Sequence, residues 1–446
     1  MKRYSEYKES GAEWLPEIPD KWETSHVKRV CQNVTDGAHT SPDLSSPDKP
    51  FVTVVNIKNG KIDLKDCLYT SQRDYDQLVR NGCKPQNGDV LYSKDGTIAE
   101  TIVVNETASF VVGSSLIILK PNRLVIPQYL KLILASYSLK NEAFKVLRGA
   151  GLPRISIGNV AKLQILKPPP EDQKSIANYL EKETGKIDQK IAGLEKKTLL
   201  YKELKQSIIN ETVTRGLPAK EAQAAGLTPN SPLKDSGIPW IGEIPEHWEV
   251  RRNKDIFKKH SRKPLSSDGV VTAFRDGQVT LRSKRRSIGF TNSLKEIGYQ
   301  RIKKGDLVLH AMDAFAGAIG VAEETGKSSP VYSAYTPIDI NSICIPYYGY
   351  LIREMSLTGF IQSFAKGIRE RSTEFRHKEF APLFMILPPQ KEQLAIASYL
   401  DRKTTHIDKI TATITEQITT LKELRKTLIN DVVTGKICVT DDKLTK

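Results

Sequence analysis

Basic side chains of this chain gather on short turns, where they can reach a polyanion. The first group is Lys94-Asp95-Gly96-Thr97, just after an expected strand, and the second holds Arg148 and Arg154 beside a glycine-rich stretch. The later candidates are Arg275, Arg282, Lys284, Arg285, Arg286, Arg369, Arg371 and Arg376. Runs of charge are usually solvated surface, but lysine and arginine on turns also contact phosphates and base edges. As a set, these residues predict a nucleic-acid-binding surface.

Motifs that would carry catalysis are incomplete. Thr325-Gly326-Lys327-Ser328 ends like a phosphate-binding loop, but Val321 stands where that pattern needs its first glycine. Asp172-Gln173-Lys174 is similar to one end of a metal-dependent nuclease site, whereas the second copy, Glu392-Gln393-Leu394, lacks the lysine. The helix dipole already favours acidic residues in a first turn. The seven histidines show no metal-ligand spacing. We therefore expect no catalytic residue and no metal site.

The charge balance favours a polyanionic partner. The 446 residues include 67 lysines and arginines against 52 aspartates and glutamates, a formal net charge of +15. Nucleic acid is the expected partner, and an anionic membrane surface is the weaker alternative. Five widely spaced cysteines indicate neither a disulfide framework nor a zinc cluster. A polar N-terminus and the lack of an 18-residue apolar run predict no signal peptide, no membrane span and a cytoplasmic protein.

Two long helices are predicted by an apolar residue at every seventh position. The expected helix–helix seam consists of Leu180, Ile187, Leu194, Tyr201 and Ile208 in the first copy and Leu400, Ile407, Ile414, Leu421 and Leu428 in the second, 220 positions later. Either copy alone would fit an ordinary amphipathic helix of a core. Because the pattern occurs twice, we expect two helices that pack along each other as a coiled coil.

The ends of these helices are marked by proline and glycine. Prolines at 168–170 and at 388–389 suit helix starts, and Gly216 and Gly435 suit helix ends. We therefore expect spacer helices at residues 168–216 and 388–436. A linker rich in small residues spans 217–235 and a tail spans 437–446. So short a linker favours an antiparallel helix pair.

The remaining chain divides into two globular domains, residues 1–167 and 236–387. Each opens with an Ile-Pro-x-x-Trp-Glu segment, and these two segments hold all four tryptophans, in what we expect to be ordered docking loops. Within the domains the patterns predict strands at 51–57, 88–92, 115–119 and 305–309. They predict helices at 127–147 and 346–364. The expected fold class is α/β (α+β) with a pseudo-twofold internal repeat: two globular domains separated by two long antiparallel coiled-coil helices.

This order of segments resembles the specificity subunit of type I restriction-modification systems over essentially the whole chain. The resemblance rests on the repeated Trp segments and on Gln173-Lys174-x-Ile176-Ala177-x-Tyr179-Leu180 with its second copy, Gln393-Leu394-x-Ile396-Ala397-x-Tyr399-Leu400. It implies two target recognition domains, each reading one half of a bipartite double-stranded DNA sequence. It also implies that the helices dock two methyltransferase subunits that use S-adenosylmethionine. Motor-nuclease subunits would use ATP and Mg²⁺, and this chain would hold no cofactor.

Two other classes remain open from the residues alone. A standalone nuclease or methyltransferase with unusual motifs would cut or modify DNA as the purified chain. A coiled-coil adaptor would be indifferent to DNA even at low salt.

Overall fold

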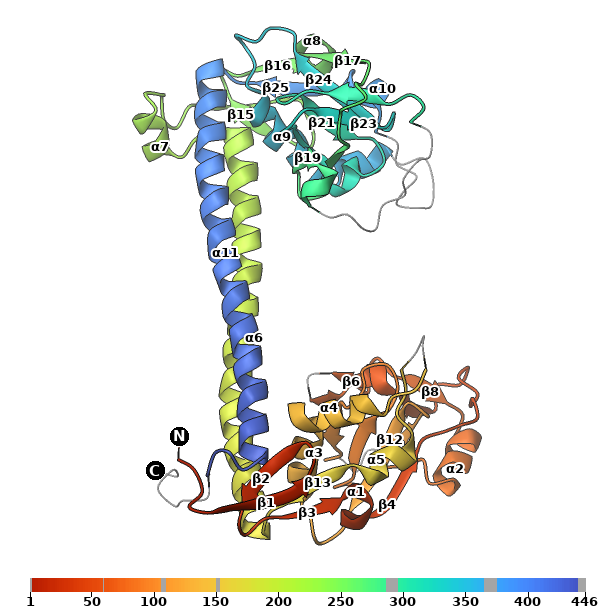
Figure 1. Ribbon diagram of the computed structural model, residues 1–446. Helices are drawn as coiled ribbons and strands as arrows, with labels where there is room; N and C mark the ends of the chain where they lie inside the picture. Colours follow the sequence, from red (N-terminus) through yellow and green to blue (C-terminus); the bar gives the residue numbers. More distant parts are fainter. Residues whose placement is uncertain are drawn as a thin grey trace. The chain divides into compact units, whose positions relative to one another are not determined.

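The computed structural model describes residues 2–58, 60–105, 110–149, 153–285, 296–364 and 375–439. It divides into two compact units (Figure 1). Unit 1 consists of Met1–Glu195 together with Thr415–Lys446, and unit 2 consists of Lys196–Ile414. Each unit therefore contains one globular part and a portion of both long helices.

The long helices are α6, Pro170–Arg215, and α11, Gln390–Val433. Pro170 is the first residue of α6, a position where the missing N–H costs no helical hydrogen bond. Both helices end before a glycine in the left-handed region, Gly216 at φ +90° and Gly435 at φ +75°. The helices thus begin and end within two or three residues of the bounds expected from the sequence.

The two helices run antiparallel within each unit. In unit 1, Asp188 Oδ1 accepts from Arg425 Nε at 2.9 Å, and Glu195 lies 3.7 Å from Lys422. In unit 2, Lys205 Nζ donates to Asp408 Oδ1 at 2.7 Å. The expected seam residues Leu180, Ile187, Leu400, Ile407, Ile414 and Leu428 are buried, and Leu194, Tyr201, Ile208 and Leu421 are half-buried.

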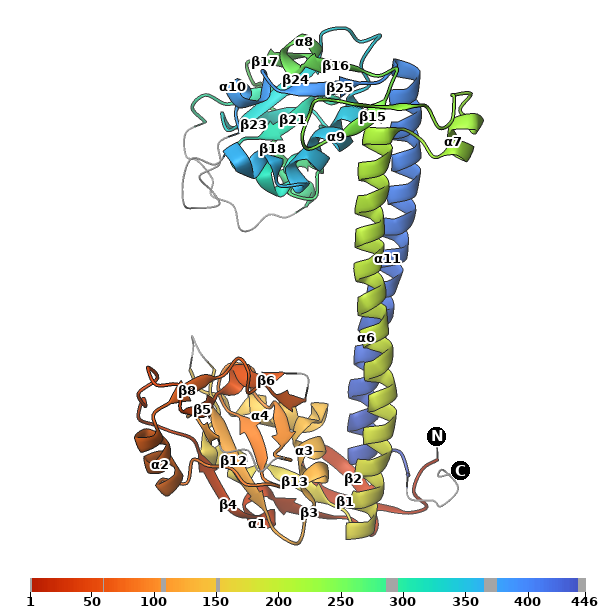
Figure 2. The same cartoon turned by 180° about the vertical axis from the view of Figure 1, so that it is seen from behind.

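The globular part of unit 1 is built on an antiparallel four-stranded sheet of order β10-β9-β12-β4. Strands β12 and β4 of this sheet are labelled in Figure 2. A second sheet has the order β11-β5-β8, and the pairs β1-β2, β3-β13 and β6-β7 complete the strands. The strands are β1 Tyr7–Ala12, β2 Leu15–Pro19, β3 Glu23–His26, β4 Cys31–Asp36, β5 Lys49–Val52, β6 Ile57–Lys58, β7 Lys61–Ile62, β8 Leu68–Thr70, β9 Val90–Ser93, β10 Thr101–Val103, β11 Val111–Val112, β12 Leu116–Pro121 and β13 Gln164–Lys167.

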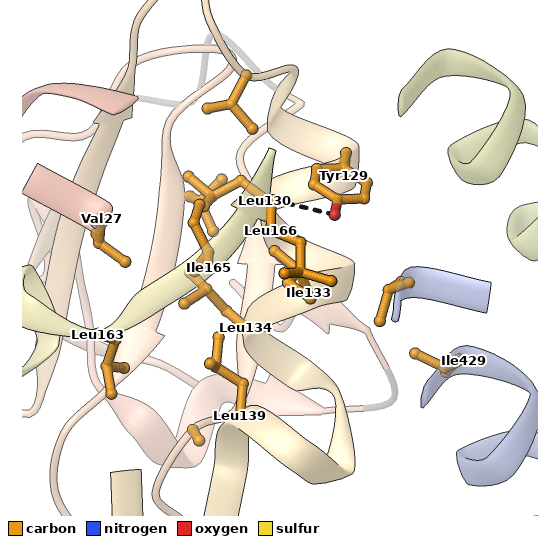
Figure 3. Packing of buried hydrophobic residues seen from close by; sticks show 14 of the residues in the cluster. Val27, Tyr129, Leu130, Ile133, Leu134, Leu139, Leu163, Ile165, Leu166 and Ile429 are labelled. Atoms are coloured by element: carbon orange, nitrogen blue, oxygen red, sulfur yellow. Dashed lines mark hydrogen bonds between the residues drawn. The ribbon is translucent and has the colours of Figure 1, made fainter. Parts of the chain in front are cut away.

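Helix α3 connects this sheet to the long helices. The helices of the globular part are α1 Val27–Val30, α2 Gln72–Arg80, α3 Pro127–Ala135, α4 Tyr137–Lys145 and α5 Ile157–Lys162. Figure 3 shows Leu130, Ile133 and Leu134 of α3 in one buried cluster with Ile429 of α11. Tyr129 in the same cluster donates a 3.1 Å hydrogen bond to the carbonyl of Leu166. The globular part of unit 1 is therefore fixed to α11 by a shared core.

Unit 2 repeats this plan with a four-stranded antiparallel sheet of order β17-β24-β21-β22. Helix α9 carries Tyr347, Tyr348, Leu351 and Ile352 into a core shared with α6 and α11. The elements are α7 Ala219–Ala224, β14 Leu233–Asp235, β15 Glu243–Pro245, β16 Glu249–Arg252, α8 Asn253–Ile256, β17 Phe257–His260, β18 Val271–Ala273, β19 Val279–Leu281, β20 Gln300–Ile302, β21 Leu307–His310, β22 Ile319–Val321, β23 Gly326–Ser328, β24 Tyr332–Pro337, α9 Ile345–Leu357, α10 His377–Phe380 and β25 Phe384–Leu387.

Two expected elements are interrupted in unit 1. The expected strand at 51–57 ends with β5, and Val54–Asn56 form a 3-10 turn, because Asn56 Oδ1 accepts from Thr53 N at 2.9 Å and competes with strand pairing. The expected helix at 127–147 is broken at Ser136, whose ψ of 151° is extended and whose side chain caps α4. In unit 2, the expected helix at 346–364 likewise ends at Leu357.

The Trp segments were predicted as loops, but they contain paired strands. In unit 1, β1 and β2 form an antiparallel hairpin, and in unit 2, β14 pairs with β15. The side chains of Trp22 and Trp248, which follow these hairpins, are fully buried. The Pro and Gly residues of these segments lie at strand ends and turns, so they do not prevent pairing.

Candidate nucleic-acid interface

The turn Lys94–Thr97 of unit 1 follows β9 at the end of the central sheet. Ser93 anchors this turn: its hydroxyl donates to the carbonyl of Thr97 and accepts from Glu100 N at 2.8 Å. Gly96 has φ +66°, so glycine is favoured there, and both Gly96 and Thr97 are exposed. The turn therefore presents its tip to solvent on a fixed backbone.

The structure brings this turn together with the two arginines of the later glycine-rich stretch. Arg148 and Arg154 exchange backbone hydrogen bonds of 2.9 and 2.8 Å, and Ile155 N donates to the carbonyl of Lys94 at 3.1 Å. The side chain of Arg154 pairs with Asp95 at 3.0 Å. Two stretches that the sequence presents separately thus form one basic surface with Arg148 and Arg154 exposed.

The sequence did not indicate two residues of this surface, Asp36 and His39. Asp36, at the end of β4, forms an ion pair with Lys94 and accepts from His39 Nε2 at 2.9 Å. Asp36 precedes Lys94 by 58 positions, so nothing in the local sequence indicates the pair. Gly37, the next residue, allows a close backbone approach, since a Cβ there would lie 2.1 Å from the carbonyl oxygen of Val112.

In unit 2, basic residues line a cleft of about 530 Å³ between β18, β21 and the turn after β18. The lining contains the predicted candidates Arg275, Arg282 and Arg285, together with Phe274, His310, Asp313 and Tyr332. The aromatic and acidic members were not predicted from the sequence. Three arginines beside aromatic rings form an environment that suits the edges and faces of nucleobases.

Each basic candidate at this cleft is held by another side chain. Arg275 Nη2 donates to Asp313 Oδ1 at 2.8 Å. Arg285 pairs with Asp276 at 2.8 Å, and its guanidinium lies 4.1 Å from the ring centroid of Phe274. These contacts orient the guanidinium groups before any ligand arrives, which favours directional recognition.

The neighbouring candidates are held in the same way. Lys284 forms an ion pair with Glu324, and its hydrogen bond lowers the pKa of the Glu324 carboxyl. Arg282 Nε donates to Thr272 Oγ1 at 3.3 Å. These contacts join the turn after β19 to β18 and to the loop between β22 and β23. Arg282 and Lys284 are therefore held by side-chain contacts, as Arg285 is.

His310 and Tyr332 form the uncharged wall of the cleft. Their rings meet edge to face with centroids 4.5 Å apart. Burial lowers the pKa of His310 and raises the pKa of Tyr332 to about 12. His310 Nδ1 accepts from the backbone N–H of Asp313 at 2.9 Å, which assigns the imidazole proton to Nε2. At neutral pH both side chains are uncharged hydrogen-bonding groups.

The other candidates lie elsewhere. Arg376 precedes α10, where its backbone N–H donates to Glu379 Oε2 at 3.1 Å, and it is not among the residues lining the cleft. Arg286, Arg369 and Arg371 lie outside the described residues. The cleft therefore includes three of the predicted arginines of unit 2.

The same backbone hydrogen bond holds the turn after the central strand in both units. In unit 1, Ile155 N donates to the carbonyl of Lys94 at 3.1 Å, and 220 positions later Phe375 N donates to the carbonyl of Ala311 at 3.0 Å. Lys94 and Ala311 both stand at the turn after the central strand of their sheet. A lysine in one unit thus corresponds to an alanine in the other. The backbone hydrogen bond is the same in the two units, while the side chains at this turn differ.

The residues of the nuclease-like motif have a structural explanation. Trp22 Nε1 donates to Asp172 Oδ2 at 2.9 Å in unit 1, and Trp248 Nε1 donates to Glu392 Oε2 at 2.9 Å in unit 2. Each carboxylate stands in the first turn of a long helix, where the helix dipole also stabilises it. The motif therefore joins the tryptophan hairpins to the helices.

No three His, Cys, Asp or Glu side chains come together in a metal-binding arrangement in the part of the chain that the structure describes. No helix within the described ranges is both long enough and apolar enough to span a membrane.

Comparisons with known proteins agree with this architecture. Residues 19–196 match the family model of the type I restriction modification DNA specificity domain. The chain is 24% identical over 445 residues to the putative type I restriction enzyme MjaX specificity subunit of Methanocaldococcus jannaschii, covering 95% of this chain and 96% of that protein. It is 20% identical to the type I restriction enzyme EcoKI specificity subunit of Escherichia coli K12, covering 94% of this chain and 90% of that protein.

A solved structure shares the fold. Its chain, from work on complex assembly and conformational transition of the type I R-M system, aligns with a TM-score of 0.66 over 94% of this chain and 99% of its own length, at 16% identity. The repeated tryptophan hairpins, the two long helices and the full-length relatives agree with one another. Residues 19–196 thus match the type I restriction modification DNA specificity domain, and the chain is similar over almost its whole length to specificity subunits of type I restriction enzymes.

Proposed function

We propose that this chain recognises the DNA sequence for a type I restriction-modification complex and that each globular part reads one half of a two-part target. The observation that carries the proposal is the repeated backbone hydrogen bond at Lys94 and Ala311, around which the two units present different side chains. Such duplication suits an asymmetric target, because one copy can change its base preference while the other is retained. Base edges supply this preference, and phosphate contacts supply affinity.

An exchange of one globular part tests whether each part reads its own half of the target. Residues 20–165 are replaced with the equivalent region of a homologue, and the chain is expressed with its methyltransferase partners. Long-read sequencing then gives the methylated motif. We expect one half of the motif to change and the other to stay the same, because the exchanged region lies within unit 1. If a folded chimera changed both halves of the methylated motif, the two globular parts would not read separate half-sites.

The positive charge predicts salt-dependent binding by the purified chain. Lysines and arginines that neutralise phosphates release counterions, so the logarithm of affinity falls by about 0.9 per contact for each unit of log salt. Arg285→Ala is expected to weaken binding, and to reduce this slope by about one if Arg285 contacts a phosphate. A flat salt response of the intact chain would argue against a DNA-binding role and in favour of a coiled-coil adaptor.

We also propose that catalysis belongs to partner subunits. Two methyltransferase subunits docked on α6 and α11 would supply S-adenosylmethionine chemistry, and motor-nuclease subunits would use ATP and Mg²⁺. The purified chain should then bind DNA without cutting or methylating it. Mg²⁺-dependent cleavage by this chain alone would support the standalone enzyme instead. The methylation motif mapped in cells with and without the gene links the recognised sequence to this chain.

A further inference from the structure

We propose that Arg275 and Asp313 together read one G·C base pair in the DNA half-site of unit 2. This inference rests on the proposed function and adds a specificity-determining pair to it. Arg275 Nη2 donates to Asp313 Oδ1 at 2.8 Å on the wall of the 530 Å³ cleft. The two side chains are 56% and 34% exposed, so a ligand in the cleft can reach both.

The chemistry of the pair matches a G·C edge in the major groove. Guanine presents O6 and N7 as acceptors there, and cytosine presents its N4 amino group as a donor. Arginine is the common partner of guanine O6 and N7, and a carboxylate accepts from cytosine N4. A guanidinium has five N–H donors, so the bond from Nη2 to Asp313 leaves further donors for guanine. One donor group and one acceptor group side by side therefore complement one base pair.

The turn that carries Arg275 is held in place by contacts with α9 and with Gly317. The half-buried Arg353 of α9 donates through Nη2 to the carbonyl of Arg275 at 3.3 Å. Gly277 has φ +91°, and a Cβ there would lie 2.6 Å from the Arg353 side chain. Gly317, at φ +88°, allows an equally close approach, since its Cβ would lie 2.8 Å from the Arg275 carbonyl oxygen. These close approaches define one conformation of the turn.

Asp313 is equally well fixed. Its backbone N–H donates to His310 Nδ1 at 2.9 Å, and its carbonyl accepts from Ala316 N at 3.0 Å. The guanidinium of Arg275 also lies over the ring of Phe315, 5.9 Å from its centroid. Pre-ordered partners lose little conformational entropy on binding, which favours base discrimination. A phosphate at this place would meet the negative charge of Asp313, so the pair favours a base edge over the DNA backbone.

The test compares Arg275→Ala with Arg251→Ala in the full chain, expressed with its methyltransferase partners. Arg251 is a matched control, because it is 55% exposed, pairs with Glu249 at 2.7 Å in the same unit and does not line the cleft. The half-site of unit 2 is the half that stays unchanged when residues 20–165 are exchanged. We expect Arg275→Ala to make one G·C position of this half-site degenerate in the methylated motif, while Arg251→Ala leaves the motif unchanged.

Binding by the purified chain gives the magnitude. Duplexes that carry the motif, with either G·C or A·T at that position, are titrated with each variant. Arg275→Ala should reduce the preference for G·C by about 10- to 100-fold, as expected for the loss of one bidentate base contact. Arg275→Lys keeps the charge but loses the planar fork, so it should also reduce the preference while leaving the salt slope unchanged. Asp313→Asn should raise affinity for DNA without the motif and lower discrimination.

Three results would overturn the assignment. The first is an unchanged motif for Arg275→Ala. The second is an equal loss of affinity for all sequences with a salt slope reduced by about one, which identifies a phosphate contact. The third is an Arg275→Lys variant that discriminates as well as wild type. In each case a wild-type complex with a two-part motif would leave the proposed function intact, whereas a wild-type complex without such a motif would defeat the proposed function itself.

Discussion

Three basic residues of the two surfaces are paired with carboxylates in the free chain. Lys94 pairs with Asp36, Arg154 with Asp95 and Arg285 with Asp276. DNA that approaches such a residue replaces or extends an existing ion pair, so it gains less energy than it would from an isolated charge. Exposed pairs such as Arg154–Asp95 and Arg285–Asp276 contribute about 0–1 kcal/mol to stability, so they do not prevent binding. The side chain of Lys94 is only 14% exposed and is held more firmly by Asp36. We infer that this arrangement limits sequence-independent attraction and leaves a larger share of affinity to base contacts.

A second residue-scale feature is the buried glutamine at the start of each long helix. Gln393 Nε2 donates to the carbonyls of Pro388 and Ser342 at 2.7 and 2.9 Å, and its Oε1 accepts from Cys344 N at 2.7 Å. Gln173 makes the equivalent three bonds in unit 1. Both side chains are almost fully buried. The glutamine therefore joins the start of the helix to the segment that leads into the domain helix.

Gln393→Ala should lower the free energy of unfolding by about 3 kcal/mol. Three buried backbone groups lose their hydrogen-bond partner, and each unsatisfied group costs about 1–3 kcal/mol. The total stays near the lower end because water that enters the site replaces part of the lost bonding. Urea denaturation followed by tryptophan fluorescence measures the change. Gln362→Ala, at an exposed position of the same unit, is the control and should change stability little. Equal stability of the two variants would show that the glutamine does not hold the junction.

At the scale of elements, the sequence predicted what depends on local periodicity. The heptads of α6 and α11 and the glycines at 216 and 435 define these helices because spacing and backbone freedom are properties of the local chain. The strand expected at 51–57 was wrong because a side-chain contact from Asn56 to Thr53 competes with pairing. The pairs Asp36–Lys94 and Arg275–Asp313 could not be predicted, since each joins turns of different strands.

Helix α9 contains an acidic residue whose burial predicts a pH effect. Glu354 is 3% exposed, and Gln206 of α6 donates to its carboxylate. Burial raises the pKa of Glu354, so the folded state binds its proton more tightly than the unfolded chain does. The stability that Glu354 contributes is therefore complete below its ordinary pKa of 4.5 and is lost as pH rises through its raised value in the folded state.

Glu354→Gln removes this loss, because a neutral amide can still accept from Gln206. We expect the variant to gain stability relative to wild type as pH rises from about 4.5 to 7. Thermal unfolding at a series of pH values measures the difference. Glu323→Gln, at an exposed position of the same unit, serves as control. A pH-independent difference between Glu354→Gln and wild type would contradict a raised pKa.

At the scale of the whole molecule, each unit is assembled from distant parts of the chain. In unit 1, Tyr7 Oη donates to the carbonyl of Gly435 at 2.8 Å, and Cys438 N donates to the carbonyl of Lys2 at 2.9 Å. In unit 2, Tyr347 Oη donates to the carbonyl of Val213 at 2.8 Å. The end of α11 thus belongs to unit 1, and the end of α6 belongs to unit 2. Contacts of this kind follow from the duplication and the antiparallel helices together.

The long helices span both units, so their length bears on the number of unread base pairs between the half-sites. Helices α6 and α11 contain 46 and 44 residues, and each contributes residues to both units without interruption. We expect their length to set this number. Seven residues inserted into both helices, near Thr198 and near Ile418, keep the heptad register and add about 10 Å at 1.5 Å per residue. At about 3.4 Å per base pair, this corresponds to roughly three base pairs.

The insertion also changes the rotation between the half-sites. Three base pairs turn DNA by about 100°, which the lengthened complex must absorb, so lower methylation activity is expected. Sequencing of methylated DNA from cells that carry the variant should show both half-sites unchanged and a longer spacer. A four-residue insertion at the same positions is the control, because it breaks the heptad seam and should abolish methylation instead of shifting the spacer. An unchanged spacer in an active seven-residue variant, or new bases in either half-site, would mean that helix length does not measure the target.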